Sequence, residues 1–394
     1  SVKWAARPLH PMAKLFRAAV GVVVWASRAS SFGKSDLLGI AGGGAGVCGI
    51  GTNMLNGNDR AMATFCDMKL DFWWNWGTTP LHSYSAACAE QTFMPMVWGA
   101  RADIENVAWQ AGKKFSSIMG YNEPDHYAPP IHPGGDYLSS GSFADNFHCG
   151  SEQLAENWQR MVIAYRRERP DGVIVSPAVA DASGTASTGD YSACNASPQT
   201  PENHMFECPG WLLCFKRNVM RLQCGETNCW DAIDVIQFHA YLYSATSFHK
   251  TAQTWEDAWA EDLQARNGRT RKTLWLTEFA HAGTTDASDP DGAGRAFMRG
   301  VINYMAASPY FSGWSWFSQD KGSFASFEIS GIVPTSPFWD SSLITSSGSL
   351  TALGEEYLSL CQARSGPSAS ASRAPEPSMI SESRCRDCGQ VLFS

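Results

Sequence analysis

The amino-acid sequence predicts one catalytic domain with a (β/α)8 barrel, an α/β fold of the TIM type. Eight short runs rich in β-branched and aromatic residues are predicted, and segments of helical character lie between several of them. This alternation indicates a parallel sheet whose strands are joined by helical crossovers. The chain has 394 residues, of which 44% are hydrophobic and only 17% charged, so a large core is available. A doubly wound open sheet is the alternative fold.

The expected strands and helices follow each other along the chain. The strands are predicted at residues 47–53, 70–76, 92–98, 115–121, 172–177, 232–239, 273–279 and 313–317. The helices are predicted at residues 102–111, 151–167, 211–223, 255–266 and 294–307. In the second helix Ser151 is a candidate cap, and apolar residues from Leu154 to Tyr165 recur at helical spacing.

The remaining segments surround a predicted domain at residues 47–361. Residues 1–30 contain a basic start at Met12, an apolar run at 18–26 and small residues after it, which is typical of a secretory signal, with a buried helix as the alternative. The run is far shorter than the ~20 residues that span a bilayer. Residues 31–46 form a Gly-rich lead-in, and residues 362–394 a Ser/Ala/Pro-rich tail. We therefore expect a secreted protein, extracellular or in the cell wall, that does not associate with a membrane.

The cysteines agree with export. The chain has 12 of them, and six lie in or before one loop-rich region, as disulfides do in an oxidising compartment: Cys149, Cys194, Cys208, Cys214, Cys224 and Cys229. Their connectivity cannot be deduced from the sequence. Asn195 begins a glycosylation sequon within a long insertion at 181–210, on the face where such barrels carry their sites. Cys385 and Cys388 are half of a zinc-ribbon pattern with no second pair.

Several classes of partner are disfavoured. The formal charge of −8 argues against a nucleic-acid binder. Residues 44–49 match the dinucleotide pattern GxGxxG, but they precede a strand instead of following one. Asp125, His126 and His132 lack the ligand spacing of a metal site. We expect no cofactor, no metal and a monomer.

Two glutamates carry the candidate chemistry. Glu123 follows the fourth predicted strand within the run GYNEPDH, and Glu278 ends the seventh within LWLTEF. The carboxyl ends of barrel strands converge on one mouth, so the two side chains are expected to face each other. Paired carboxylates across a cleft are what cleavage of a glycosidic bond requires. Asn122, beside Glu123, is suited to bind a sugar hydroxyl.

Other polar and aromatic residues also end predicted strands. His239 and Tyr241 end the sixth, and Tyr241 is expected to hydrogen-bond the nucleophile and hold it ionised. Trp74, Trp98 and Trp316 end the second, third and eighth strands, where flat side chains can contact sugar rings. Because the chain contains 16 Trp, core packing is the alternative role for each.

The ordered motifs DFWWNWG, FMPMVWG, IMGYNEPDH, VIVSPAVA, DVIQFHAY, LWLTEF and GWSWF resemble the catalytic domain of glycoside hydrolase family 128, the β-1,3-glucanases, over residues 47–361. The resemblance implies a small (β/α)8 barrel that cleaves β-1,3-glucan with retention, and we expect endo action. It implies Glu123 as acid/base and Glu278 as nucleophile. Asn122, His239, Tyr241 and Trp316 match supporting and sugar-contacting positions. Ala240 stands where the family often has an aromatic residue.

These expectations leave two rivals. One is a barrel glycosidase acting on another β-glycan, and the other is a non-catalytic glycan-binding protein of the cell wall. Double displacement predicts carboxyl groups about 5–5.5 Å apart, whereas ~8 Å indicates inversion. It also predicts a raised pKa for Glu123 and an ionised Glu278.

Overall fold

The structure is a computed structural model. It describes residues 46–51, 59–80, 92–99, 101–124, 126–127, 152–180, 206–207, 210–264, 271–284, 286–317 and 340–363. The predicted leader, almost all of the insertion at 181–210 and the tail beyond residue 363 lie outside the described residues, so export stays a prediction. Among the described helices, none combines the length and the apolar character that a membrane span needs.

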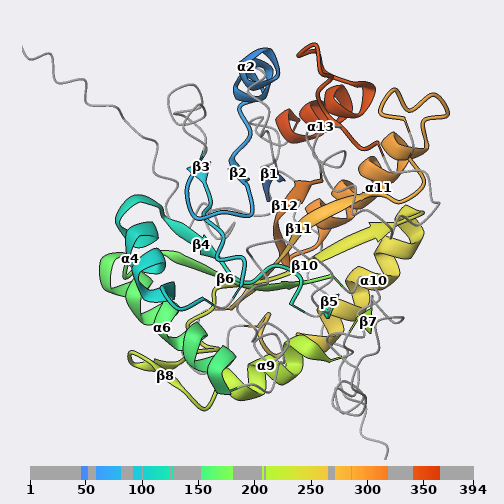
Figure 1. Cartoon of the computed structure of the whole chain (residues 1–394). Helices are drawn as coiled ribbons and strands as arrows, with labels where there is room; N and C mark the ends of the chain where they lie inside the picture. The colour runs from blue at the N-terminus through green and yellow to red at the C-terminus, as the bar shows by residue number, and fades with distance from the viewer. Residues whose placement is uncertain are drawn as a thin grey trace, which may run out of the picture.

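Eight parallel strands form the central sheet, and all eight coincide with predicted strands (Figure 1). They are β1 (Val47–Gly51), β2 (Phe72–Trp74), β3 (Thr92–Phe93), β4 (Ser117–Met119), β6 (Val173–Val179), β10 (Val235–Leu242), β11 (Thr273–His281) and β12 (Phe311–Trp316). Their order in the sheet is their order in the chain, and β12 pairs with β1. This order contradicts a doubly wound sheet, in which the strand order reverses.

The segment after β3 closes the sheet into a barrel. Met96 and Met119 form a parallel bridge between this segment and β4. The amide of Val97 donates to the carbonyl of Met119 at 3.0 Å, and the amide of Met119 donates to the carbonyl of Pro95 at 2.8 Å. The predicted (β/α)8 barrel is therefore confirmed.

Helices lie around the outside of the barrel (Figure 1). They are α2 (Asp59–Asp67), α4 (Ile104–Lys114), α6 (Glu152–Glu168), α9 (Trp211–Val219), α10 (Ala245–Ala258), α11 (Ala293–Ala307) and α13 (Ala352–Gln362). The bounds of the helix predicted at 255–266 were wrong. It corresponds to α10, which begins at Ala245 because Ser244 caps it by accepting a hydrogen bond from the amide of Ser247. Helices α2 and α13 were not predicted. Short antiparallel pairs complete the fold: β5 (His126–Tyr127) with β7 (Phe206–Glu207), and β8 (Gln223–Cys224) with β9 (Thr227–Asn228).

Two apolar layers hold the barrel together. The inner layer fills the barrel with Val47, Phe72, Trp74, Met94, Met96, Met119, Val173, Val175, Val235 and Trp275. The outer layer lies between the sheet and the helices, and residues such as Trp158 of α6 and Trp255 of α10 are completely buried there. Core packing is thus the role of most of the described tryptophans.

Disulfides tie parts of this framework together. Cys48 of β1 is bonded to Cys361 of α13 across 313 positions, and Cys224 is bonded to Cys229 across the turn between β8 and β9. Cys66 and Cys214 are also disulfide-bonded. The prediction of disulfides in the region that contains Cys224 and Cys229 is confirmed.

Candidate active site

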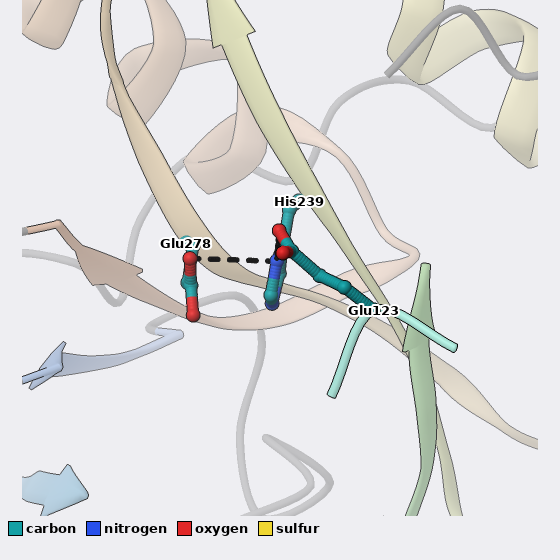
Figure 2. A group of neighbouring side chains, drawn as sticks. All are labelled: Glu123, His239 and Glu278. Carbon is teal, nitrogen blue, oxygen red and sulfur yellow. Dashed lines mark hydrogen bonds and ion pairs between the residues drawn. The ribbon is translucent and has the colours of Figure 1, made fainter. Parts of the chain in front are cut away.

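Three side chains meet at the carboxyl ends of the strands. Glu123 follows β4, His239 lies on β10 and Glu278 on β11; Figure 2 shows them converging with the imidazole between the two carboxylates. Nδ1 of His239 is 2.8 Å from Oε1 of Glu123 and 3.4 Å from Oε2 of Glu278. One ligand atom from each of the three residues lies within 4.8 Å of the others. The structure therefore brings together the two glutamates that are 155 positions apart in the sequence.

A β-bulge aims Glu278 at this cluster. Trp275 packs inside the barrel, whereas Leu276 and Phe279 pack in the outer layer. In a regular strand, residues three apart face opposite sides. The Glu278 side chain would then point out of the barrel, because Trp275 points into it. The pairing with β10 shifts by one residue between Phe238 and His239, which leaves His239 opposite Glu278. The extra residue on β11 turns the Glu278 side chain inward, a known use of bulges near active sites.

The backbone at Glu123 is strained. Its φ is +43°, a left-handed conformation that costs a residue other than glycine roughly 1–3 kcal/mol. Hydrogen bonds to both neighbouring segments fix this conformation. The amide of Glu123 donates to the carbonyl of Ala178 at 2.8 Å, and the amide of Asn122 donates to the carbonyl of Trp98 at 2.9 Å. The neighbouring strands thus hold the carboxylate where a relaxed backbone would not place it.

Glu278 is almost completely buried and receives two aromatic donors. The hydroxyl of Tyr241 donates to Oε2 at 2.5 Å, as the sequence predicted, and the indole N–H of Trp76 donates to Oε1 at 3.2 Å. Burial raises the pKa of Tyr241 well above its usual value, and the two carboxylates raise it further, so the phenol keeps its proton. Both oxygens of the Glu278 carboxylate are therefore hydrogen-bonded.

The protonation of Glu278 differs from the expectation that it is fully ionised. Burial raises its pKa to about 7, and the negative charge of Glu123 acts in the same direction. The nearby His239 and the hydrogen bonds from Tyr241 and Trp76 lower it, but by less than burial raises it. The physical reason is that desolvation of a carboxylate inside the barrel outweighs the donors around it.

The predicted aromatic residues occupy different environments. Trp74 is completely buried in the barrel interior, and its indole N–H donates to Ser315. Trp316 is completely buried in the outer layer, where its indole N–H donates to the carbonyl of Ser341. The prediction that these two contact sugar was therefore wrong for the described structure. Trp98 is 43% exposed and stays a candidate.

Two aromatic residues at the cluster were missed as site residues. Trp76 follows β2 and Phe317 follows β12, and both are partly exposed. Trp76 lies two positions beyond the predicted Trp74, and Phe317 directly follows the predicted Trp316. The sequence signal was present in the runs WWNW and WSWF, but the run alone does not say which ring lies at the mouth.

Asn122 is buried, with 8% of its surface exposed, and its Oδ1 has no hydrogen-bond partner in the described part of the chain. This oxygen is itself buried, so the binding of a sugar hydroxyl by Asn122 stays a prediction. Ala240, where the family often has an aromatic residue, is completely buried in the outer layer of the core. Its side chain does not line the mouth.

Glu123, His239 and Glu278 also have the donor chemistry of a cation site, since an imidazole nitrogen and two carboxylate oxygens lie close together. The expectation that no metal takes part stays a prediction.

Comparisons with known proteins identify the family of the chain. The family described as "Glycosyl hydrolase catalytic core" matches residues 49–357, which include both glutamates. No curated protein sequence matches the chain.

Matches among solved structures have low sequence identity to this chain. An exo-β-1,3-glucanase of glycoside hydrolase family 128 (subgroup VI) from Aureobasidium namibiae matches with a TM-score of 0.50 and 16% identity, over 80% of this chain and 96% of that one. An endo-β-1,3-glucanase (subgroup I) from Amycolatopsis mediterranei, in complex with laminaripentaose, has a TM-score of 0.48, 16% identity and coverage of 80% and 99%. An oligosaccharide-binding protein (subgroup VII) from Trichoderma gamsii has a TM-score of 0.47, 17% identity and coverage of 82% and 96%.

The family match covers most of the chain, from within β1 to within α13. It includes the two strands whose ends carry Glu123 and Glu278. The chain belongs to the glycosyl hydrolase catalytic core family, as the resemblance of its motifs predicted.

Proposed function

We propose that this protein is a retaining glycoside hydrolase that cleaves β-1,3-glucan by double displacement. The observation that carries the proposal is the position of Glu123 and Glu278 at one barrel mouth, with one oxygen of each carboxylate within 4.8 Å of an oxygen of the other. Retaining enzymes have carboxyl groups about 5–5.5 Å apart, and inverting enzymes need about 6.5–9.5 Å to admit a water. The separation therefore favours retention.

The proposed reaction has two steps. An oxygen of Glu278 attacks the anomeric carbon, the bond to the leaving oxygen breaks, and Glu123 gives its proton to that oxygen. Glu123 then takes a proton from a water, the water oxygen attacks the anomeric carbon, and the carboxylate of Glu278 is released. Both carboxylates return to their starting states, and no external electron or proton source is consumed beyond water.

The position of His239 suits it to pass a proton between Glu278 and Glu123. Its Nδ1 contacts both carboxylates, and the side chain is completely buried. Burial raises the pKa of Glu278 to about 7, so this residue can hold near neutral pH the proton that the reaction needs on Glu123. A bound sugar displaces solvent from Glu123, which favours the protonated form of Glu123. The donors on both oxygens of Glu278 favour its ionised form, so the proton moves to Glu123.

The substrate class rests on the family and on the fold. Members of the same fold include the exo-β-1,3-glucanase from Aureobasidium namibiae. The partly exposed rings of Trp76, Phe317 and Trp98 at the mouth supply apolar surfaces of the kind that pack against pyranose rings. We propose internal cleavage of the chain as the mode of action, and exo action is the alternative outcome of the same assay.

The test is hydrolysis of a panel of glycans by the purified protein. Laminarin and laminari-oligosaccharides are expected to be cut, with mixed oligosaccharides as early products, whereas a β-1,4-glucan and a mannan are not. Release of a single small sugar from one chain end would indicate exo action. Binding of laminarin without release of reducing ends, measured by calorimetry on the same samples, would contradict the enzymatic proposal and indicate a glycan-binding protein.

A further inference from the structure

Two aromatic side chains donate hydrogen bonds to Glu278, and a third, Phe317, contacts both of them. The ring of Phe317, after β12, makes edge contacts with Trp76, after β2, at 5.5 Å between centroids and with Tyr241, on β10, at 5.7 Å. The interplanar angles are 85° and 82°, the edge-to-face geometry that aromatic pairs favour. Phe317 thus lies between the two side chains that donate to the carboxylate.

The two donors bind different oxygens of one carboxylate. Trp76 donates to Oε1 and Tyr241 donates to Oε2. A carboxylate held at one oxygen can still swing about its last torsion, which is a soft one. Donors at both oxygens fix the plane of the group, and in a nucleophile this decides which lone pair points at the anomeric carbon.

The rest of the fold holds Trp76 in place for this contact. Its backbone is left-handed, with φ of +34°, and its ring packs edge-on against the buried Trp74 at 4.8 Å. Phe317 is fixed by its amide, which donates to the carbonyl of Phe279 on β11 at 3.0 Å. Strained backbone that the surroundings stabilise is typical of functional positions.

We propose that Trp76 is a positioning residue that orients the Glu278 carboxylate through its indole N–H, and that Phe317 holds Trp76 and Tyr241 in register for this task. The inference rests on the proposed function for its kinetic consequences. Its structural content, that the N–H of Trp76 stabilises ionised Glu278, holds whether or not the protein is an enzyme.

The expected effects follow from the sign of the interaction. A donor favours the ionised carboxylate, so its removal raises the pKa of Glu278, a group that also faces Glu123, His239 and Tyr241. Glu278 attacks in its ionised form, so the rate rises with pH as it loses its proton. Loss of the donor therefore moves the acidic limb of the rate profile to higher pH.

The experiment compares Trp76→Phe and Phe317→Leu with the wild type. We expect Trp76→Phe to lower kcat about 10-fold, the effect of losing one hydrogen bond to a charged group, with KM changed by less than about twofold. Phe317→Leu is expected to act in the same direction but more weakly, and the double variant to lose less than the product of the two effects, because both act through one contact.

The matched control is Trp109→Phe. Trp109 lies on α4 and also donates its indole N–H to a carboxylate, Oε1 of Glu168, at 2.5 Å, but on the outside of the barrel. This variant should keep the kinetics of the wild type. The proposal would be overturned if Trp76→Phe kept the wild-type pH profile, or if it raised KM and left kcat unchanged. Trp76 would then be a sugar-contacting residue only.

A second measurement separates this inference from the proposed function. Carbon-13 NMR of glutamate-labelled protein, with the signal of Glu278 assigned from Glu278→Gln, reports the titration of that carboxyl without any turnover. The proposal requires a higher pKa in Trp76→Phe than in the wild type even if no glycan is hydrolysed. Should Trp76→Phe fail to fold, Phe317→Leu is titrated instead, and an unshifted pKa there counts against the proposal.

Discussion

Replacing Glu278 by glutamine is expected to lower the hydrolysis of laminarin by about 10⁴-fold or more, because the amide cannot attack the anomeric carbon. Glu123→Gln is expected to cost about 10²–10⁴-fold, the usual contribution of a general acid. Glutamine keeps the shape of the side chain, so both variants should retain the circular dichroism spectrum of the wild type. Activity within about tenfold of the wild type in either variant would contradict the role assigned to that residue.

The two roles can be told apart with azide and an aryl β-laminaribioside, whose leaving group needs no acid. In Glu278→Ala, azide can take the place of the nucleophile and attack from its side of the sugar, so an α-glycosyl azide is expected. In Glu123→Ala, azide attacks the glycosyl-enzyme in place of water, and a β-glycosyl azide is expected. The opposite pair of products would show that the two glutamates have exchanged roles.

Removal of the disulfide between Cys48 and Cys361 is expected to cost about 5–6 kcal/mol of unfolding free energy in a double alanine variant. The bond joins the first strand of the barrel to its last described helix, across 313 positions. It therefore restricts almost the whole unfolded chain, and the entropy lost by a cross-linked unfolded chain grows with the length of the closed loop.

The matched control is the double alanine variant of Cys224 and Cys229, whose bond spans 5 positions and should contribute only about 2 kcal/mol. Urea denaturation of the wild type and both variants gives the comparison. An equal loss in the two variants, or none for the long-range pair, would mean that the bond between Cys48 and Cys361 does not stabilise the barrel by closing it.

The sequence predicted the strands well because each has a strong local signal. The run LWLTEF, for example, is apolar and rich in strand-forming residues, and Glu278 is its first charged residue. Parallel strands then bring their carboxyl ends to one mouth by topology alone, so the proximity of Glu123 and Glu278 could be expected without knowing any contact.

The facing of individual side chains could not be predicted in the same way. Trp316 and Trp74 both end strands, but Trp316 faces the outer layer and Trp74 lies one layer below the mouth. In strands, a shift of one residue exchanges the two faces, and the shift on β11 that turns Glu278 inward depends on pairing with β10. Register and bulges depend on the pairing with neighbouring strands, so they cannot be predicted from the sequence of one strand.

The balance of charges at the site was also beyond the sequence. Tyr241 was expected to keep Glu278 ionised, and the hydrogen bond is present. Complete burial of Glu278 nevertheless raises its pKa, because the barrel interior excludes the water that solvates a carboxylate. Burial depends on how the whole barrel packs around that position.

The most direct test of double displacement by Glu123 and Glu278 is the anomeric configuration of the first product. Proton NMR recorded during hydrolysis of a laminari-oligosaccharide, before mutarotation, distinguishes the two anomers of the new reducing end. Two displacements at one carbon predict that the β-anomer appears first and the α-anomer only later. Initial release of the α-anomer would show a single displacement by water and would contradict the account.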